Sequence, residues 1–314
     1  MAPGPLAVGF WGGAEEKESI RAIESAINNG MTTIDTAPIY GFGQSEEVTG
    51  KAIKGKRDKV QILTKFVLRW DTVSENLHIE NTKDNRGNTL SVYKVGRKES
   101  IIEECENSLK RLGTDYIDLY QQHWPDDKTP VEETMEALEI LKTQGKIRAG
   151  GVSNFSAEQM DEACRYFRLT SNQVPYSMVL RDIEKELVPY CIANNKAIIA
   201  YSPLQRGILT GKINSDYKFN EGDHRPDTPF FKAPNFSRIN RFLKEIKPIA
   251  DGKNATLAQL VIRWTLYRPG ISCVLVGARS EKQVLENIQA AGLTFSCDEM
   301  KLINEKLNNL SLEL

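Results

Sequence analysis

The chain has 314 residues, with 41 lysines and arginines against 42 aspartates and glutamates, and this balance gives no electrostatic reason to expect nucleic acid or an anionic membrane as a partner. No apolar run approaches the roughly 20 residues of a membrane span, and residues 1–13 lack the pattern of a signal peptide. Five scattered cysteines without a C-x-x-C pair indicate reduced thiols and no metal site, so we expect a cytoplasmic globular protein, most often an enzyme.

The first part of the chain alternates strand-like and helix-like segments. Strands are predicted at residues 6–10, 31–34 and 60–64, and helices at 15–28 and 45–53. The run Gly41 to Glu46 lacks the third glycine of a Rossmann phosphate loop, and we interpret it as a tight entry into a helix capped by Ser45. Residues 66–96 are polar without a clear period, which predicts a long functional or mobile loop.

The same alternation continues to the end of the chain. Strands are predicted at residues 116–120, 147–152, 171–174, 197–200 and 274–276, with helices at 99–112 and 183–192 and a short one after residue 297. Pro130 fits the first position of a helix. Four pairs with the spacing of a capping box mark further helix starts: Thr129–Glu132, Ser156–Gln159, Thr256–Gln259 and Ser280–Gln283.

About eight strand–helix cycles follow one another, and no linker or change of composition divides them. Alternation of this kind requires a parallel sheet, because parallel neighbours need crossover connections. A (β/α)8 TIM barrel fits better than an open doubly wound sheet, whose glycine fingerprint is missing. We therefore predict an α/β protein with a single barrel domain over residues 1–314.

Four proton-handling side chains follow the ends of successive predicted strands. Asp35 ends the second strand and Tyr40 lies in its loop, whereas Lys65 ends the third strand and His123 follows the fourth. Each alone has a structural interpretation: a loop cap, a packed ring, a lysine that reaches solvent, a core histidine. Because a barrel gathers its functional groups at the carboxyl ends of its strands, the four together predict one site.

Carbonyl reduction is the chemistry that needs this set. A tyrosine has an ordinary pKa near 10, so as a proton donor it gains from an ammonium that stabilises the phenolate left behind. Lys65 supplies that charge in this hypothesis, and Asp35 holds Lys65 as an ion pair. His123 would bind the carbonyl oxygen and orient it.

Further motifs accompany these four residues, at 35–41 with 43–46, Thr64-Lys65, 109–112 with 115–119, 122–125, and 145–148 continuing into 151–155. Taken together, they resemble the signature of the aldo-keto reductase superfamily, and look closest to the bacterial general-stress and inositol-related NADPH-dependent reductases. The resemblance implies a barrel that binds NADPH/NADP+ first, and a catalytic tetrad at the four residues above.

The resemblance also implies positions for the cofactor. It places the nicotinamide carboxamide at Ser153, Asn154 and Gln173, beside Asp35, and stacks the ring on Tyr201. The pyrophosphate would lie along a segment whose assigned positions are Ser202, Pro203, Leu204, Gly207, Leu209 and Lys212.

The adenosine end can also be argued from the residues. Arg279 precedes a helix that starts at Ser280, so a guanidinium, backbone amides and the helix dipole would converge on one anion. A ribose 2′-phosphate suits this site, which favours NADPH over NADH. Gln283 is explained equally by its capping box and by an adenine contact, which the resemblance extends to the remaining positions, Gly277, Glu286 and Asn287.

The substrate pocket is expected around Tyr40 and His123, with Trp11, Trp70 and Trp124 as its walls and Trp11 also against the cofactor. Residues 66–96 and 201–236 would close over it. Many relatives have a longer amino-terminal hairpin below the barrel, and here the first strand begins by Leu6; the short carboxyl-terminal tail makes selection by a carboxyl-terminal loop doubtful.

The leading hypothesis is a monomeric NADPH-dependent reductase of small aldehydes or ketones. A redox-sensing subunit that binds NADPH and regulates a partner is the first alternative. The second is an aldolase in which Lys65 forms a Schiff base. The anion site at Arg279 and the pairing of Lys65 with Asp35 argue against the aldolase.

Overall fold

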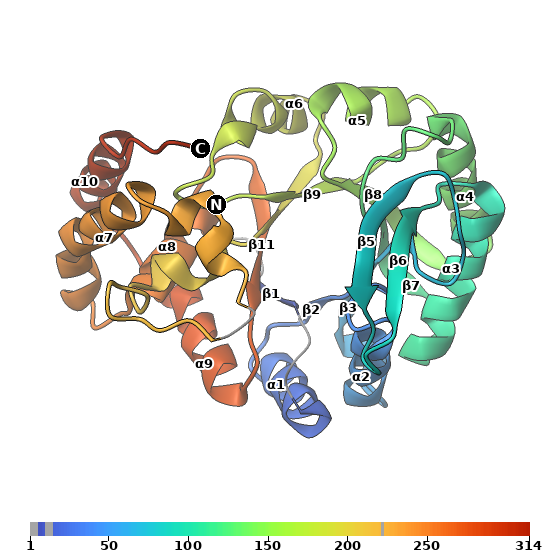
Figure 1. Cartoon of the computed structure of the whole chain (residues 1–314), viewed down its shortest axis with the longest axis horizontal. Helices are drawn as coiled ribbons and strands as arrows, with labels where there is room; N and C mark the ends of the chain where they lie inside the picture. Colours follow the sequence, from blue (N-terminus) through green and yellow to red (C-terminus); the bar gives the residue numbers. More distant parts are fainter. Residues whose placement is uncertain (1–5, 10–14, 221–222) are drawn as a thin grey trace.

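Eight short parallel strands alternate with helices along the chain and close into a barrel. The computed structural model describes residues 6–9, 15–220 and 223–314. Around the barrel the strands follow the order β1-β2-β3-β7-β8-β9-β10-β11, and β11 pairs with β1 to close it (Figure 1). The predicted (β/α)8 fold is confirmed. The strands are β1 (Leu6–Gly9), β2 (Thr33–Asp35), β3 (Gln61–Phe66), β7 (Ile117–Gln122), β8 (Ile147–Ser153), β9 (Ser171–Pro175), β10 (Ala197–Tyr201) and β11 (Ile271–Gly277).

Helices surround the barrel and bury their apolar faces against the outside of the strands. Within the described residues, none is both long and apolar enough to cross a membrane. Short 3₁₀ turns connect several elements, among them η3 (Gln205–Thr210) after β10. The helices are α1 (Glu16–Asn28), α2 (Gln44–Ala52), α3 (Lys98–Leu112), α4 (Val131–Thr143), α5 (Ala157–Ala163), α6 (Leu187–Ala193), α7 (Asn235–Asp251), α8 (Leu257–Leu266), α9 (Glu281–Gln289) and α10 (Cys297–Asn308).

The strand alternation divides side chains between the helices and the barrel interior. On β3, Leu63 belongs to a small buried cluster with Ile199, Cys273 and Leu275 of β10 and β11, separate from the main core. Lys65 has the same parity as Leu63 and therefore points to the same side. The interior thus changes from apolar to polar toward the carboxyl ends of the strands.

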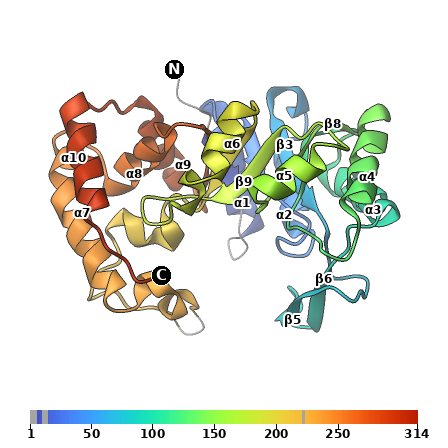
Figure 2. The same cartoon turned by 90° about the horizontal axis from the view of Figure 1, so that it is seen from above.

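The segment predicted as a long loop forms a small antiparallel sheet instead. Its strands are β4 (Leu68–Arg69), β5 (Leu77–Lys83) and β6 (Thr89–Lys94), and we call residues 68–94 the arm. At the hairpin turn the Asp84 carboxylate accepts the backbone N–H groups of Arg86 and Asn88, both at 2.8 Å. The arm projects from the barrel on the same side as the end of the chain (Figure 2). Its polar composition reflects that exposure.

The predicted helix starts are partly confirmed. Ser156–Gln159 and Thr256–Gln259 form complete capping boxes. Ser280 caps α9, but the Gln283 side chain accepts the N–H of Arg279 instead of that of Ser280. The box at Thr129 is wrong, because its hydroxyl donates to Asp126 and the cap position belongs to Pro130, which had been placed inside the helix.

Three further expectations need correction. Ser45 does not cap α2: Gly43 holds the cap position at φ 98°, and the Ser45 hydroxyl lies 2.8 Å from that of Thr36. The predicted helix over 183–192 is divided into a 3₁₀ turn, Asp182–Glu184, and α6. Helix α7, with 17 residues, had not been predicted.

Candidate active site

A buried ion pair joins the ends of β2 and β3. The Lys65 ammonium donates to Oδ2 of Asp35 at 2.8 Å and to the backbone carbonyl of Thr36 at 2.9 Å. The side chain of Lys65 is fully buried and that of Asp35 is 4% exposed. Such a pair is stable in an apolar interior only when its geometry is good and other polar partners complete it. The carbonyl of Thr36 and the neighbouring strands meet this condition.

Tyr40 and His123 complete the group predicted from the sequence. The Lys65 ammonium lies 4.9 Å from the centroid of the Tyr40 ring. The ring of His123 approaches Tyr40 edge to face, with centroids 5.8 Å apart and an interplanar angle of 80°. The four residues, contributed by three strand ends and one loop, therefore lie side by side at the carboxyl end of the barrel.

The charges of the group follow from burial and from the ion pair. Burial alone would lower the pKa of Lys65, but the Asp35 carboxylate and Tyr40 outweigh it, and the pKa is raised. Burial raises the pKa of Tyr40 and the Lys65 ammonium opposes this only in part. Burial and Lys65 hold the pKa of His123 well below its ordinary value. At neutral pH the site therefore contains an ammonium, a protonated phenol and a neutral imidazole.

The loop that carries Tyr40 is fixed by backbone shape and by a buried acid. Gly41, Phe42 and Gly43 have φ values of 62°, 52° and 98°, a left-handed run that glycine favours. Glu46, which is fully buried, accepts from the hydroxyl of Thr64 and from Arg111, both at 2.6 Å. The turn and this anchor hold the start of α2 against β3 and α3.

A hydrogen-bonded group lies beside Asp35 at the ends of β8, β9 and β10. The side-chain amide of Gln173 donates to Oδ1 of Asp35 at 2.7 Å. The Ser153 hydroxyl donates to the backbone carbonyl of Gln173, also at 2.7 Å. Asn154 donates to the carbonyl of His123 at 3.0 Å and accepts from the Tyr201 hydroxyl at 2.9 Å. The residues assigned to a nicotinamide ring therefore adjoin the four above.

The segment after Tyr201 has an unusual backbone. Gln205, Arg206 and Gly207 are left-handed in succession, with φ values of 43°, 54° and 95°. The N–H groups of Gln205 and Gly207 donate within the turn, to the carbonyls of Ser202 and Leu204, both at 2.9 Å. Of the positions assigned to the pyrophosphate, Pro203 and Leu209 are buried, and Ser202, Leu204 and Gly207 are partly exposed. The side chain of Arg206, between the two bonded N–H groups, is exposed.

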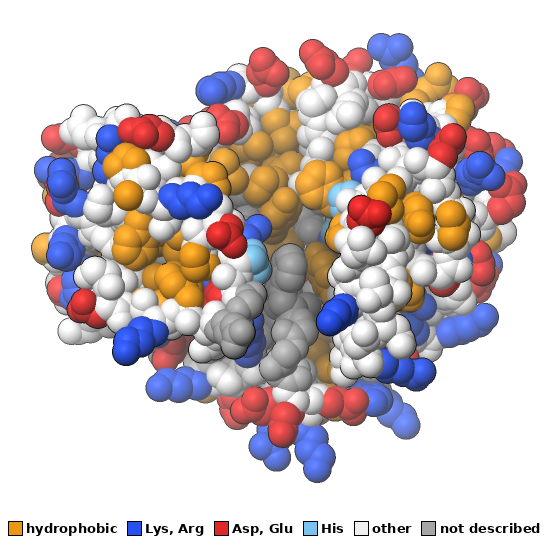
Figure 3. Space-filling model, in the orientation of Figure 1, with side chains coloured by type: hydrophobic (Ala, Val, Ile, Leu, Met, Phe, Trp, Pro, Cys, Tyr) orange, Lys and Arg blue, Asp and Glu red, His pale blue; other side chains and the backbone are white. Residues whose placement is uncertain are grey.

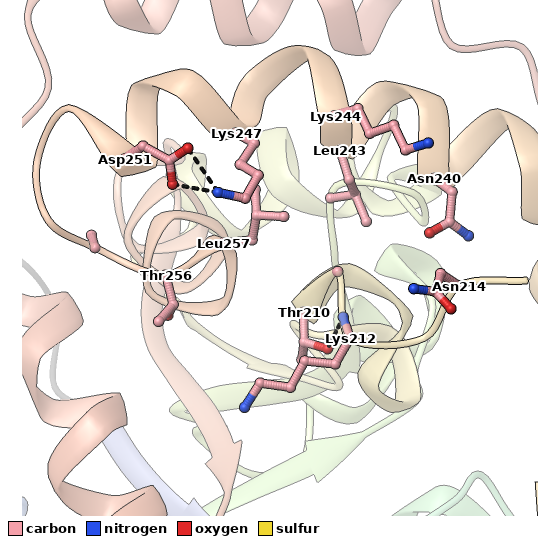
Figure 4. Close-up of a pocket in the computed structure, with 12 residues that line it drawn as sticks. Thr210, Lys212, Asn214, Asn240, Leu243, Lys244, Lys247, Asp251, Thr256 and Leu257 are labelled. Atoms are coloured by element: carbon pink, nitrogen blue, oxygen red, sulfur yellow. Dashed lines mark hydrogen bonds and ion pairs between the residues drawn. The ribbon is translucent and has the colours of Figure 1, made fainter. Parts of the chain in front are cut away.

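Lys212 is exposed on the border of a cavity between η3 and α7 (Figure 4). The cavity has a volume of about 460 Å³. The ammonium of Lys247 on α7 binds Asp251, whereas the Lys212 side chain extends away from α7. The Lys212 side chain is thus exposed to a ligand that approaches η3.

The start of α9 presents Arg279 to solvent. Its backbone N–H donates to Gln283 at 2.7 Å, so that side chain is occupied in ordering the turn. Asn287 is buried and donates to the Gly277 carbonyl at 3.4 Å, and Glu286 lies 4.0 Å from Lys282. Asn287 orders the end of β11 here, which the sequence could not show.

Two of the three tryptophans predicted around the pocket pack against other aromatic rings. Trp70 packs edge to face on Phe42, with centroids 5.5 Å apart, and Trp124 lies 5.5 Å from the ring of His78. The surface is hollowed between the part of the molecule that carries the arm and the part that carries α7 (Figure 3). Trp11 lies outside the described residues. No group of three or more metal-ligating side chains occurs within the described part of the chain.

Three residues near the site were not identified from the sequence. His78 lies on the arm, and its position required the sheet that had not been predicted. Gln121 is the register partner of Lys65 on β7; it is fully buried, and neither polar atom of its amide bonds to a described residue. Glu104 of α3 is a buried acid that accepts the N–H of Val67 at 3.1 Å. In the sequence, only the presence of a charged residue on the buried face of α3 pointed to Glu104.

Comparison with known proteins agrees with this geometry. The family model described as "Aldo/keto reductase family" matches residues 5–308. The chain is 42% identical to aldo-keto reductase YhdN of Bacillus subtilis, over 98% of this chain and 89% of the relative. It is 35% identical to the NADH-specific methylglyoxal reductase of Escherichia coli, over 97% of this chain and 93% of the relative.

Two solved structures extend the comparison. The glycerol dehydrogenase AKR11B4 from Gluconobacter oxydans has a TM-score of 0.87 and 36% identity, covering 97% of this chain and 91% of its own. An aldo/keto reductase from Klebsiella pneumoniae, solved in complex with NADP and acetate, has a TM-score of 0.71 and 29% identity, covering 96% of this chain and 90% of its own.

Proposed function

The chain belongs to the aldo/keto reductase family, and on that premise we propose that it reduces aldehydes or ketones to alcohols with NADPH. The observation that carries the proposal is the arrangement of Tyr40 between the ammonium of Lys65 and the imidazole of His123. A proton donor, a cation and a neutral hydrogen-bonding group at one barrel mouth suit the conversion of a carbonyl oxygen to a hydroxyl.

The protein's part in the reaction is to supply and direct one proton. NADPH, when bound, supplies the hydride that reduces the carbonyl carbon. The neutral imidazole of His123 donates a hydrogen bond to the carbonyl oxygen and orients it. Tyr40 transfers its phenolic proton to that oxygen, and the Lys65 ammonium stabilises the phenolate that remains. Asp35 keeps Lys65 charged and in place through the 2.8 Å ion pair.

The choice of nicotinamide cofactor rests on two features of the chain. The exposed cations Arg206 and Lys212 of the segment after Tyr201 suit the pyrophosphate, and Arg279 at the start of α9 suits a ribose 2′-phosphate. Among related proteins, the Klebsiella pneumoniae reductase was solved with NADP, whereas the Escherichia coli relative is NADH-specific. We assign NADPH here because of Arg279.

Two alternatives make different demands on the same residues. An aldolase needs an uncharged Lys65 amine as nucleophile, and the Asp35 carboxylate that raises the pKa of Lys65 opposes this. A regulatory NADPH-binding subunit would hold the cofactor without turnover. We propose a monomer acting on small carbonyl compounds, and a panel of aldehydes and ketones separates it from the regulatory alternative.

The test is the Tyr40→Phe variant. Removing the phenolic hydroxyl should lower kcat by on the order of 10²–10⁴ and leave the Kd for NADPH unchanged, because only the proton donor is lost. Steady-state kinetics measure kcat, and fluorescence titration measures the Kd for NADPH. Tyr166→Phe, at a side chain that is 46% exposed, is the matched control. Unchanged turnover in Tyr40→Phe would refute the role of Tyr40.

A further inference from the structure

The arm begins three residues after Lys65, and its base is firmly held. Val67 has a φ of 89°, a conformation that a β-branched residue rarely adopts. The buried carboxyl group of Glu104 accepts its N–H, at 3.1 and 3.3 Å to the two oxygens. Arg69, 7% exposed, binds Asp71 through two hydrogen bonds of 2.6 and 2.9 Å. The direction in which the arm projects is therefore fixed.

The far parts of the arm touch both loops that carry proposed catalytic groups. At its tip, the Asn85 amide donates to the carbonyl of Gly41 at 2.6 Å, next to Tyr40. At its other edge, Asn76 donates to Asp126 at 2.5 Å and to Asp127 at 2.9 Å, in the loop after His123. The arm thus spans from the Tyr40 loop to the His123 loop and forms one wall of the mouth.

His78 is a polar residue on the inner face of that wall. Its strand neighbours Leu77 and Ile79 are 47% and 41% exposed, whereas His78 is partly buried, so it points the opposite way. Its ring lies 5.5 Å from that of Trp124, the residue after His123. This contact holds the ring in place. Neither of its nitrogens makes a hydrogen bond within the described residues.

The chemistry of that side chain limits what it can select. Burial and the nearby Lys94 lower the pKa of His78, so the ring is neutral at pH 7 and offers one donor and one acceptor. A hydroxyl group also has one donor and accepts hydrogen bonds, and it matches both. A neutral imidazole offers no opposite charge to a charged group of the substrate. An alkyl chain would leave both ring nitrogens without a hydrogen bond.

We propose that His78 is a specificity-determining residue, which selects carbonyl substrates bearing a hydroxyl group on a carbon near the carbonyl. The inference rests on the reductase function proposed above and assigns its substrate class: short hydroxylated aldehydes and ketones. Trp124 supports the imidazole of His78, and the preceding residue, His123, holds the carbonyl oxygen. The preference therefore arises from the arm, a small sheet that is separate from the eight-stranded barrel.

The experiment compares glyceraldehyde with propanal, which have the same three-carbon chain with and without hydroxyl groups. The wild-type protein should show the higher kcat/KM for glyceraldehyde at saturating NADPH. His78→Phe, which keeps a ring against Trp124, should lower the ratio of the two kcat/KM values by on the order of tenfold. His78→Gln keeps a donor and an acceptor and should retain most of the preference. Ile79→Ala, on the outer face of the same strand, should leave the ratio unchanged.

The outcomes separate this inference from the proposed function. A wild-type protein that reduces neither aldehyde refutes the reductase and the inference together. Reduction of both aldehydes with the same ratio in wild type and His78→Phe refutes the inference alone. An equal loss on both substrates in His78→Phe also overturns it, because the residue would then act on the site in general. NADPH titration of each variant confirms that the cofactor site is intact.

Discussion

Replacing Glu104 by glutamine should change how the stability of the protein depends on pH. Burial raises the pKa of Glu104 from its ordinary 4.5 to about 8, and Arg69 opposes this only in part. Between these two values the folded protein holds a proton that the unfolded chain releases. Stability from this group is therefore greatest below pH 4.5 and falls as the pH rises toward 8. The loss is on the order of 3–5 kcal/mol, at about 1.4 kcal/mol for each tenfold change in proton affinity.

The assay is urea unfolding of the wild-type protein and Glu104→Gln at pH 5 to 9. Glutamine has the shape of the protonated acid, keeps an acceptor for the Val67 N–H and cannot ionise. The free energy of unfolding of the wild type minus that of the variant should therefore fall by about 3–5 kcal/mol between pH 5 and pH 9. Glu99→Gln, exposed on the same helix, is the control and should show no comparable trend. A difference that is flat or rises with pH refutes a protonated Glu104.

Two further predictions concern arginines. Arg279→Gln should raise the Kd for NADPH tenfold or more and leave that for NADH unchanged, because only the 2′-phosphate loses a partner. Equal affinity of the wild-type protein for the two nucleotides, in fluorescence titrations, would overturn the assignment. Arg111→Ala should destabilise the protein by about 3 kcal/mol in urea unfolding, because it leaves the buried Glu46 carboxylate without its ion pair. Arg111→Ala combined with Glu46→Gln should recover part of this loss, and a lack of recovery would show that packing dominates.

The barrel and the proposed catalytic group were predictable because each depends on local pattern and strand order. Asp35, Lys65 and His123 follow apolar runs that can only be buried strands, and adjacent parallel strands bring their ends together. The arm was not predictable in the same way. Its strand β5 is largely exposed, and the register of β5 with β6 is interrupted twice, so no regular alternation of buried and exposed residues identifies the pair. Without the arm, neither His78 nor its contact with Trp124 was accessible from the sequence.

Helix α7 is a different kind of omission, because its signal was present. Ile239, Phe242, Leu243 and Ile246 have the spacing of one helical face and are all buried. The capping box at Thr129 illustrates the opposite error. Its spacing was correct, but the helix begins after Pro130, one residue later than the box requires, and the Thr129 hydroxyl donates to the Asp126 carboxylate. Spacing identifies candidates, and competing partners decide among them.

The direction of the Tyr40 pKa also lay beyond the sequence. Pairing with Lys65 suggested a phenol made more acidic, yet burial outweighs that effect and the pKa is raised. The raised pKa suits Tyr40 as a proton donor in one respect, because the phenol stays protonated over the whole neutral range. It also places more of the work on Lys65, since a phenolate formed in a buried site needs the nearby cation to compensate for the lost hydration.

Asp35 connects the proposed proton-transfer residues to the group assigned to the nicotinamide, because its two oxygens have separate partners. Oδ2 accepts from Lys65 at 2.8 Å and Oδ1 accepts from Gln173 at 2.7 Å. The backbone carbonyl of Gln173 accepts from the Ser153 hydroxyl, and Asn154 links Ser153 to Tyr201. A ligand that reorients Gln173 changes the hydrogen bonding of Asp35, and hence the charge that Lys65 experiences. The same carboxylate that keeps Lys65 protonated is thus positioned to make proton donation by Tyr40 depend on what occupies the neighbouring site.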